Sequence, residues 1–211
     1  MSISRDPIPR RHHHLTRESI ARTALQLIDQ DGLAALSMRR LAAALRVRAT
    51  NLYPYVADKE SLLHDVLDLL LSEVELPEPA GQTWEDCVVS VGVSLRAMAL
   101  RHPRAFLLVA YAPYDDPAVV DYSRRVERVF AAAGLPERLL PRLASLLDAH
   151  AVGYLLLETQ VLAESGGEPR DGATPGGASP RRAAGVVGGP EEHEEAMRTI
   201  IAGFKMRNRI E

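Results

Sequence analysis

The residues best suited to chemistry in this 211-residue chain stand in one short stretch, "RVRATNLYPYV" at positions 46–56. Its arginine, threonine, asparagine and tyrosine side chains all form hydrogen bonds. Pro54 lacks an amide N–H and disfavours helix at Tyr53, so a helix that enters this stretch ends early. Guanidinium, amide and phenol groups beside a short helix suit contact with the phosphates and bases of a nucleic acid.

The charge of the chain is distributed unevenly. Residues 1–56 hold nine arginines, no lysine and four acids, a net charge of +5, whereas the remainder holds 16 basic and 24 acidic residues, a net charge of −8. A basic N-terminal region on an acidic body indicates that the N-terminal region meets a polyanion. The alternative is chance clustering of arginine.

Four helices are predicted around the opening stretch. Helical periodicity and an N-cap at its first residue predict a helix over 16–31, which Gly32 ends. Ser37 caps a second helix, and a tight turn leads to a short third helix at about 48–54. Asp58 caps a fourth, extending to about residue 75. Two short helices joined by a tight turn after a longer one form a helix-turn-helix.

The third helix is predicted to lie in the major groove of DNA, as the second helix of such a unit does. Small polar residues let the backbone approach the bases, Asn51 can bond adenine, and Leu52 anchors the helix from inside. Tyrosine hydroxyls and a lysine at the start of the fourth helix can bond phosphates. The predicted DNA-binding residues are Arg39, Arg46, Arg48, Ala49, Thr50, Asn51, Tyr53, Tyr55 and Lys59.

Two of these arginines oppose local structure. Arg48 occupies the N-cap position, where its charge opposes the helix dipole at about 0.3–1 kcal/mol. Arg46 occupies a turn position, where a positive φ costs about 1 kcal/mol. Contact with DNA would explain both residues; the alternative is a tolerated surface arginine.

The rest of the chain is predicted to form long helices over about 83–101, 103–111, 116–133, 137–164 and 190–207. Residues 165–190 contain many glycines and prolines and are predicted to be disordered. The expected organisation is all-α: a mobile basic arm (1–15), a helix-turn-helix domain (16–57), a connecting helix (58–76) and a ligand-binding and dimerisation domain (83–211).

The segment "SMRRLAAALRVRATNLYPYVADKESLL" (37–63) resembles the DNA-binding domain of the TetR family of transcriptional repressors. The residues that match the family pattern are Leu52, Tyr53, Tyr55, Asp58 and Lys59. Arg46 and Arg48 depart from it, at the usual glycine and at the usual small polar or acidic residue. The resemblance implies a ligand-responsive regulator, a repressor that leaves a palindromic operator when a small effector binds.

A weaker resemblance covers "TWEDCVVSVGVSLRAMALRHPRAFLLV" (83–109) and "LLDAHAVGYLLLETQ" (146–160), which are similar to the helical core of the tetracycline-repressor branch. That branch has a flexible loop before its last two helices, as 165–190 would supply. The resemblance to that branch also implies a homodimer. In it, the helices at about 137–164 and 190–207 from each subunit form a four-helix bundle.

The same resemblance argues against magnesium-tetracycline as the effector. Val109 and Val91 stand where the branch has its metal-binding histidine and its drug-binding asparagine, and Glu158 stands where it has an acid near the metal. Valine offers no ligand atom, so we expect a mostly apolar pocket, no metal and no cofactor. The candidate pocket residues are Trp84, Val91, Leu95, His102, Val109, Tyr111, His150 and Tyr154. Packing or dimer roles are the alternative for His150 and Tyr154.

Other function classes find less support. No glycine-rich phosphate loop, GxSxG, HExxH or CxxC motif indicates an enzyme. A helical adaptor that binds proteins through its acidic body is the alternative. With Cys87 as the only cysteine, no intrachain disulfide can form, and with no long apolar run, no membrane span is expected. Both observations favour a cytoplasmic protein.

Overall fold

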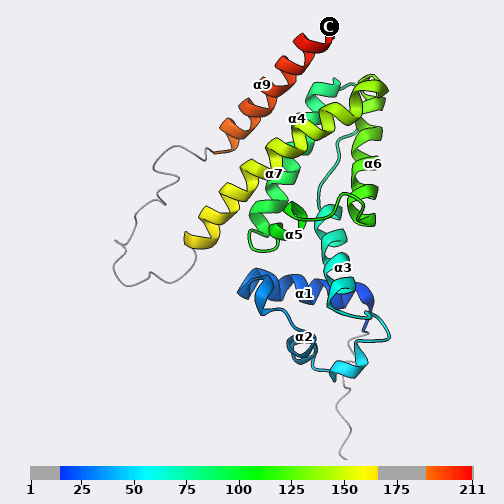
Figure 1. The fold of residues 1–211 in the computed structure, drawn as a ribbon, viewed down its shortest axis with the longest axis vertical. Helices are drawn as coiled ribbons and strands as arrows, with labels where there is room; N and C mark the ends of the chain where they lie inside the picture. Colours follow the sequence, from blue (N-terminus) through cyan, green and yellow to red (C-terminus); the bar gives the residue numbers. More distant parts are fainter. Residues whose placement is uncertain (1–14, 166–188, 211) are drawn as a thin grey trace, which may run out of the picture.

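The computed structural model describes residues 15–165 and 189–210, and these residues contain helices and no strand (Figure 1). The predicted all-α class is confirmed. The predicted mobile arm and disordered loop fall, apart from their edge residues, outside the described residues. No described helix combines the length and the apolar character that a membrane span requires.

The N-terminal head consists of α1 (Arg17–Asp31), η1 (Leu33–Ala35), α2 (Met38–Ala44) and the short 3₁₀ segment η2 (Ala49–Asn51). The predicted caps are confirmed: the Thr16 hydroxyl accepts from the amide of Ser19 at 3.1 Å, and the Ser37 hydroxyl accepts from that of Arg40 at 3.2 Å. Gly32 ends α1 with φ 82°, a conformation that costs glycine little. Local side-chain bonds therefore set these helix boundaries.

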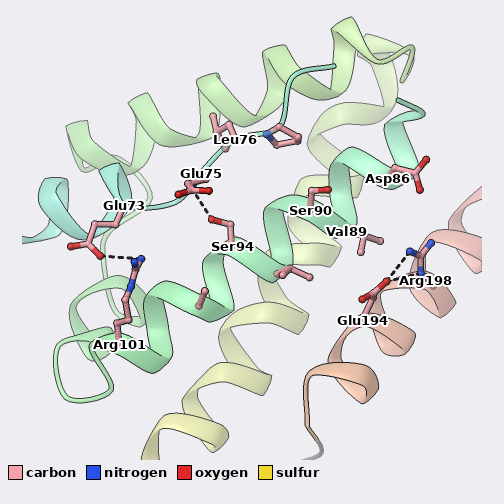
Figure 2. A pocket seen from close by; sticks show the side chains of 13 residues that line it. Glu73, Glu75, Leu76, Asp86, Val89, Ser90, Ser94, Arg101, Glu194 and Arg198 are labelled. Atoms are coloured by element: carbon pink, nitrogen blue, oxygen red, sulfur yellow. Dashed lines mark hydrogen bonds and ion pairs between the residues drawn. The ribbon is translucent and has the colours of Figure 1, made fainter. Parts of the chain in front are cut away.

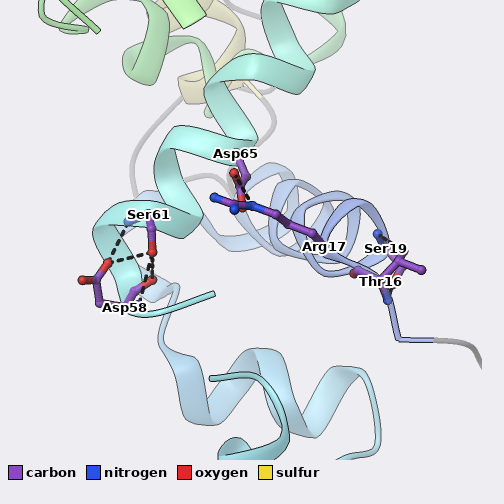
Figure 3. A network of polar contacts seen from close by, with 6 residues as sticks. All are labelled: Thr16, Arg17, Ser19, Asp58, Ser61 and Asp65. Carbon is purple, nitrogen blue, oxygen red and sulfur yellow. Dashed lines mark hydrogen bonds and ion pairs between the residues drawn. The ribbon is translucent and has the colours of Figure 1, made fainter. Parts of the chain in front are cut away.

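Helix α3 (Lys59–Ser72) connects the head to the rest of the molecule (Figure 1). Asp58 caps it, as predicted, by accepting from the Ser61 amide at 2.8 Å, and these hydrogen bonds lower the pKa of the Asp58 carboxyl. Figure 3 shows this cap next to the ion pair of Arg17 with Asp65, 2.7 Å long, which ties the start of α1 to the middle of α3. The head and the connecting helix are thus joined by both polar and apolar contacts.

The larger helical core is made of α4 (Trp84–Arg101), α5 (Phe106–Ala110), α6 (Pro117–Ala132), η3 (Glu137–Leu139), α7 (Leu140–Ser165) and α9 (Pro190–Asn208). Helix α5 is shorter than the predicted 103–111. Turns occupy 103–105, where the Arg104 side chain donates to the backbone carbonyls of Asp29 and Gln30 in α1. That contact with the head holds the segment in place.

Two large apolar clusters organise the interior. The first runs continuously from Ile20 and Leu52 in the head, through Leu62 in α3, to Phe106 and Leu155 in the core. The second lies at the far end, among α4, α6, α7 and α9. Because the first cluster crosses from head to core, a shift of core helices can be transmitted to the head through packed side chains.

Candidate DNA-binding face and core polar sites

The segment predicted as the third helix is shorter than expected. It is the 3₁₀ segment Ala49–Asn51 followed by turns at 52–55, so the prediction of a helix over about 48–54 was wrong. The Arg48 guanidinium has no acceptor atom and makes no cap bond to the first amides. At the other end Pro54 cannot donate a helical bond. A segment without an N-cap and with an early break stays at a single turn.

The side chains of this face are nevertheless presented to solvent. Leu52 is fully buried, as predicted, and its burial turns the neighbouring residues outward. Tyr53 is 53% exposed and Tyr55 40%, which is high for tyrosines and leaves their hydroxyls accessible. Ala49 is half-buried; the exposed members of the predicted set are Arg39, Arg46, Arg48, Thr50, Asn51, Tyr53, Tyr55 and Lys59.

None of the four cations in that set forms an ion pair with another described residue. By contrast, Arg17, Arg22 and Arg40 elsewhere in the head are each paired with a carboxylate. The unpaired cations are therefore available to phosphates. They lie around the 46–59 segment and in α2, where the sequence placed the DNA-binding face.

Arg46 has φ 57°, a left-handed conformation. A positive φ at this position is the case in which backbone strain is expected from the sequence. Its side chain is exposed, while the amide of Val47 bonds the Ala42 carbonyl at 2.9 Å and closes the turn after α2. A glycine would adopt this turn without strain, and the strain of a residue with a Cβ is of order 1 kcal/mol. The arginine therefore carries a local cost that nothing in the described fold offsets.

The predicted pocket residues do not gather at one place. Val91 and Leu95 lie on the inner side of α4, and Val109 is half-buried on α5. Trp84 packs edge-on against Phe204, with ring centroids 6.5 Å apart, at the far end of the core. Three others lie elsewhere: His102 at the junction with the head, and His150 and Tyr154 beside α9. Tyr111 is 74% exposed.

His102 joins three helices. Its Nδ1 lies 2.8 Å from an Asp29 carboxylate oxygen in α1, and its Nε2 lies 3.2 Å from a Glu73 oxygen at the end of α3. A ring that donates from both nitrogens is an imidazolium. The hydrogen bond to Asp29 is the main reason that the pKa of His102 is raised. The arrangement fits a connection between head and core.

A buried ion pair crosses from α4 to α7. Arg96 Nε donates to Glu158 Oε2 at 2.9 Å, and the two side chains are 15% and 4% exposed. The resemblance placed Glu158 where the tetracycline-repressor branch has an acid near the metal, but the sequence gave no indication of its partner Arg96, which lies 62 positions away. Since the guanidinium occupies the carboxylate, Glu158 is a structural anion here. No cluster of histidine, cysteine and acidic residues suited to a metal is found among the described residues.

His193 on α9 is another residue that the sequence did not single out as a site. It is fully buried, its ring stacks on His150 at 5.8 Å, and it lies 4.8 Å from the Tyr154 ring. Burial is the main cause that lowers the pKa of His193, while a contact with the backbone of Gly92 acts in the opposite direction. A periodicity argument would have found it, because His193, Met197, Ile201 and Phe204 form the buried stripe of α9.

Two family models match the chain. The model described as "Bacterial regulatory proteins, tetR family" matches residues 20–66, and the model described as "Tetracyclin repressor-like, C-terminal domain" matches residues 76–207. The chain belongs to the TetR family. The second match confirms the predicted likeness of the core to the tetracycline-repressor branch.

Individual relatives agree with the family. An HTH-type transcriptional regulator of Saccharopolyspora erythraea is 33% identical over 69% of this chain and 61% of its own length. The HTH-type transcriptional repressor DrrR1 of Streptomyces coeruleorubidus is 30% identical over 71% of this chain and 54% of its own. The chain thus matches less than two thirds of the length of either. The structure of the Streptomyces coelicolor TetR family protein ActR with actinorhodin shares 27% identity, with a TM-score of 0.70 over 90% of this chain and 96% of that one.

Proposed function

We propose that this protein is a DNA-binding transcriptional regulator that acts as a repressor in the cytoplasm and has no enzymatic activity. The observation that carries the proposal is the exposed face around 46–59 of a TetR-family head, where arginine, lysine, threonine, asparagine and tyrosine side chains form no ion pair with any residue that the structure describes. Relatives named as a transcriptional regulator and a transcriptional repressor support it.

The operator should be a near-palindrome, because we propose that the protein binds it as a homodimer. Helices α7 and α9 are the proposed dimer helices. Leu146 on α7 is 46% exposed, and a shallow groove of about 470 Å³ separates its helix from Ile200 and Phe204 of α9. Burial of this surface in a four-helix bundle would place the two heads about one turn of DNA apart.

The proposed effector is small and mostly apolar. Val91 and Val109 offer no polar anchor, and the Glu158 carboxylate is occupied by Arg96, so no group remains for a bound Mg²⁺ at that place. ActR, whose fold this chain shares, was solved with actinorhodin, so a related protein takes an organic ligand. Of the eight predicted pocket residues, we place Val91, Leu95 and Val109 at this site, because they lie on the inner side of α4 and on α5.

Helix α3 is the proposed lever between the effector and the DNA. It begins beside Lys59 at the DNA-binding face and ends next to Glu73, which contacts His102 of the core. A small rotation of α3 would change the spacing of the two heads, so that both half-sites could no longer be met together.

The test is an electrophoretic mobility-shift titration with palindromes found upstream of the protein's own gene. Specific retardation that weakens steeply with salt is expected, and Tyr53→Phe should weaken it across sequences. Protein that binds every duplex alike, or none, would favour the protein-interaction adaptor. Release from the operator by magnesium-tetracycline, reversed by a chelator, would contradict the proposed effector class.

A further inference from the structure

A groove of about 610 Å³ runs along one side of α4, between the segment that follows α3 and helix α9 (Figure 2). It is formed by three parts of the chain that are distant in sequence: 73–77, α4 and α9.

This groove is separate from the effector pocket expected inside the core. Val89, Val93 and Ala97 follow one side of α4 at helical spacing and face the groove. Val91 and Leu95 do not line the groove and belong to the apolar clusters, the second of which also contains the groove residue Val89. A ligand in the groove would therefore not touch the residues of the predicted pocket.

The floor of the groove is partly apolar. Leu76 and Pro77 lie on one wall, and the α4 side carries Val89, Val93 and Ala97 together with Ser90 and Ser94. Val93 is 46% exposed although its neighbours on the inner side of α4 are buried. An apolar group that covered this floor would remove hydrocarbon surface from water, which favours binding.

The rim of the groove is negatively charged. Four carboxylates and two guanidinium groups line it, which leaves two negative charges. Arg101 pairs with Glu73 at 3.1 Å, and Arg198 pairs with Glu194 at 2.8 Å. Both cations are thus already neutralised by carboxylates of the groove.

The two remaining acids are Glu75 and Asp86. The backbone amide of Glu75 donates to the Ser94 hydroxyl at 2.7 Å, and this hydrogen bond fixes the backbone at Glu75. No described cation pairs with the Glu75 carboxylate. Asp86 accepts only from the Thr83 hydroxyl at 2.7 Å among side chains. Both residues are exposed at the rim and free to meet a charged ligand.

We propose that this groove binds an amphipathic organic cation, whose apolar body covers the α4 side of the groove and whose charge is attracted by the carboxylates of Glu75 and Asp86. An organic anion of the same shape would meet the same floor and be repelled by the same acids. A bare metal ion does not fit, because the described residues offer no cluster that could coordinate one.

A ligand in the groove should change the contacts between the core and the N-terminal head. Glu73 belongs to the groove and also contacts His102, which holds Asp29 of α1. A positive charge bound at Glu75, two residues from Glu73, also attracts the Glu73 carboxylate and so alters this connection. This consequence, unlike the binding itself, rests on the proposed function.

The test uses two probes of nearly identical shape and opposite charge, tetraphenylphosphonium and tetraphenylborate, titrated calorimetrically into the full-length protein without DNA. Tetraphenylphosphonium should bind and tetraphenylborate should not. The variant Glu75→Gln/Asp86→Asn should weaken tetraphenylphosphonium binding by about tenfold, since each exposed charge pair contributes modestly. The control Glu60→Gln/Glu137→Gln removes two exposed acids outside the groove and should bind like the parent.

Equal binding of the two probes, no binding of the cation, or equal loss in the two double variants would overturn the proposal. Because the titration contains no DNA, none of these results bears on the proposed function, which fails if the protein without any cation does not bind its operator. In a second measurement, tetraphenylphosphonium should lower the operator affinity of the parent and leave that of Glu75→Gln/Asp86→Asn unchanged. An unchanged affinity of the cation-bound parent would overturn the connection through Glu73.

Discussion

The DNA-binding face of the head and the polar layer of the core, defined as Arg96, Glu158 and His193, differ in where their polar groups lie. At the DNA-binding face the arginines are exposed and form no ion pair within residues 15–165 and 189–210. In the polar layer Glu158 and His193 are buried and the Arg96 side chain is 15% exposed, so Arg96 and Glu158 pair with each other, and burial lowers the pKa of His193. An unpaired polar group is therefore available for binding in the first region and is a cost to the fold in the second.

The largest effect should come from the core. Glu158→Leu removes the partner of a buried guanidinium and should lower the free energy of unfolding by about 3–5 kcal/mol. Urea denaturation followed by circular dichroism measures the change. Glu85→Gln, which removes the partner of the more exposed Lys205, is the control and should cost under about 1 kcal/mol.

The double variant Arg96→Met/Glu158→Leu provides a second check on that prediction. It removes both charges and should be markedly more stable than Glu158→Leu alone. Equal instability of the two variants would show that the side chains contribute through packing and that their charges do not matter.

At the DNA-binding face, loss of a contact should affect binding and leave the fold intact. Thr50→Ala and Asn51→Ala should each weaken operator binding by about 1–3 kcal/mol and relax the choice of base. Fluorescence anisotropy with the operator and with single-base variants measures this. Because both side chains are exposed, their unfolding free energies should stay within about 0.5 kcal/mol of the parent. Parental affinity in both variants would place the reading of bases elsewhere.

Arg46→Gly should move stability and binding in opposite directions. Glycine relieves the strain of φ 57° and should raise the unfolding free energy by up to about 1 kcal/mol. Operator binding should weaken. In a plot of the logarithm of the binding constant against the logarithm of the salt concentration, the slope should become less steep by about 1, as expected for one lost phosphate contact.

Arg209→Gly is the matched control for Arg46→Gly. Arg209 also has a positive φ, 52°, but it ends α9, far from the head. Its replacement should relieve similar strain with no change in DNA binding. If the two variants bind DNA equally well, Arg46 is only a tolerated surface residue.

The smallest effects should be on the pH dependence of stability, to which two histidines contribute with opposite sign. Burial lowers the pKa of His193 in the native state, so the unfolded chain binds the proton first, and stability should fall as the pH drops below about 6.5. The hydrogen bond to Asp29 raises the pKa of His102, so its contribution should be complete below about 6.5 and be lost as the pH rises.

Urea denaturation between about pH 5 and pH 8 separates the two contributions. His193→Leu should reduce the loss of stability on the acid side, and His102→Gln should reduce the loss on the alkaline side. A variant whose pH profile equals that of the parent would show that its histidine does not titrate as the contacts indicate.

The sequence by itself determined the local structure of the head. Thr16, Ser37 and Asp58 cap helices through hydrogen bonds to residues three positions away, and such bonds are visible in a linear pattern. The family motif added the prediction that residues 46–59 contact DNA. The linear pattern predicts a longer helix than the single turn of η2, although Arg48 and Pro54, the residues that limit this turn, are present in that pattern.

Only the tertiary structure decided the polar sites of the core and the junction. Arg96 lies 62 positions from Glu158, and His102 lies 73 positions from Asp29. His193 is a site only because α9 lies against α4 and α7. A cap depends on the geometry of one helical turn, which the sequence specifies locally. A buried polar contact depends on which faces of distant helices meet, and only the packing of the whole core sets that.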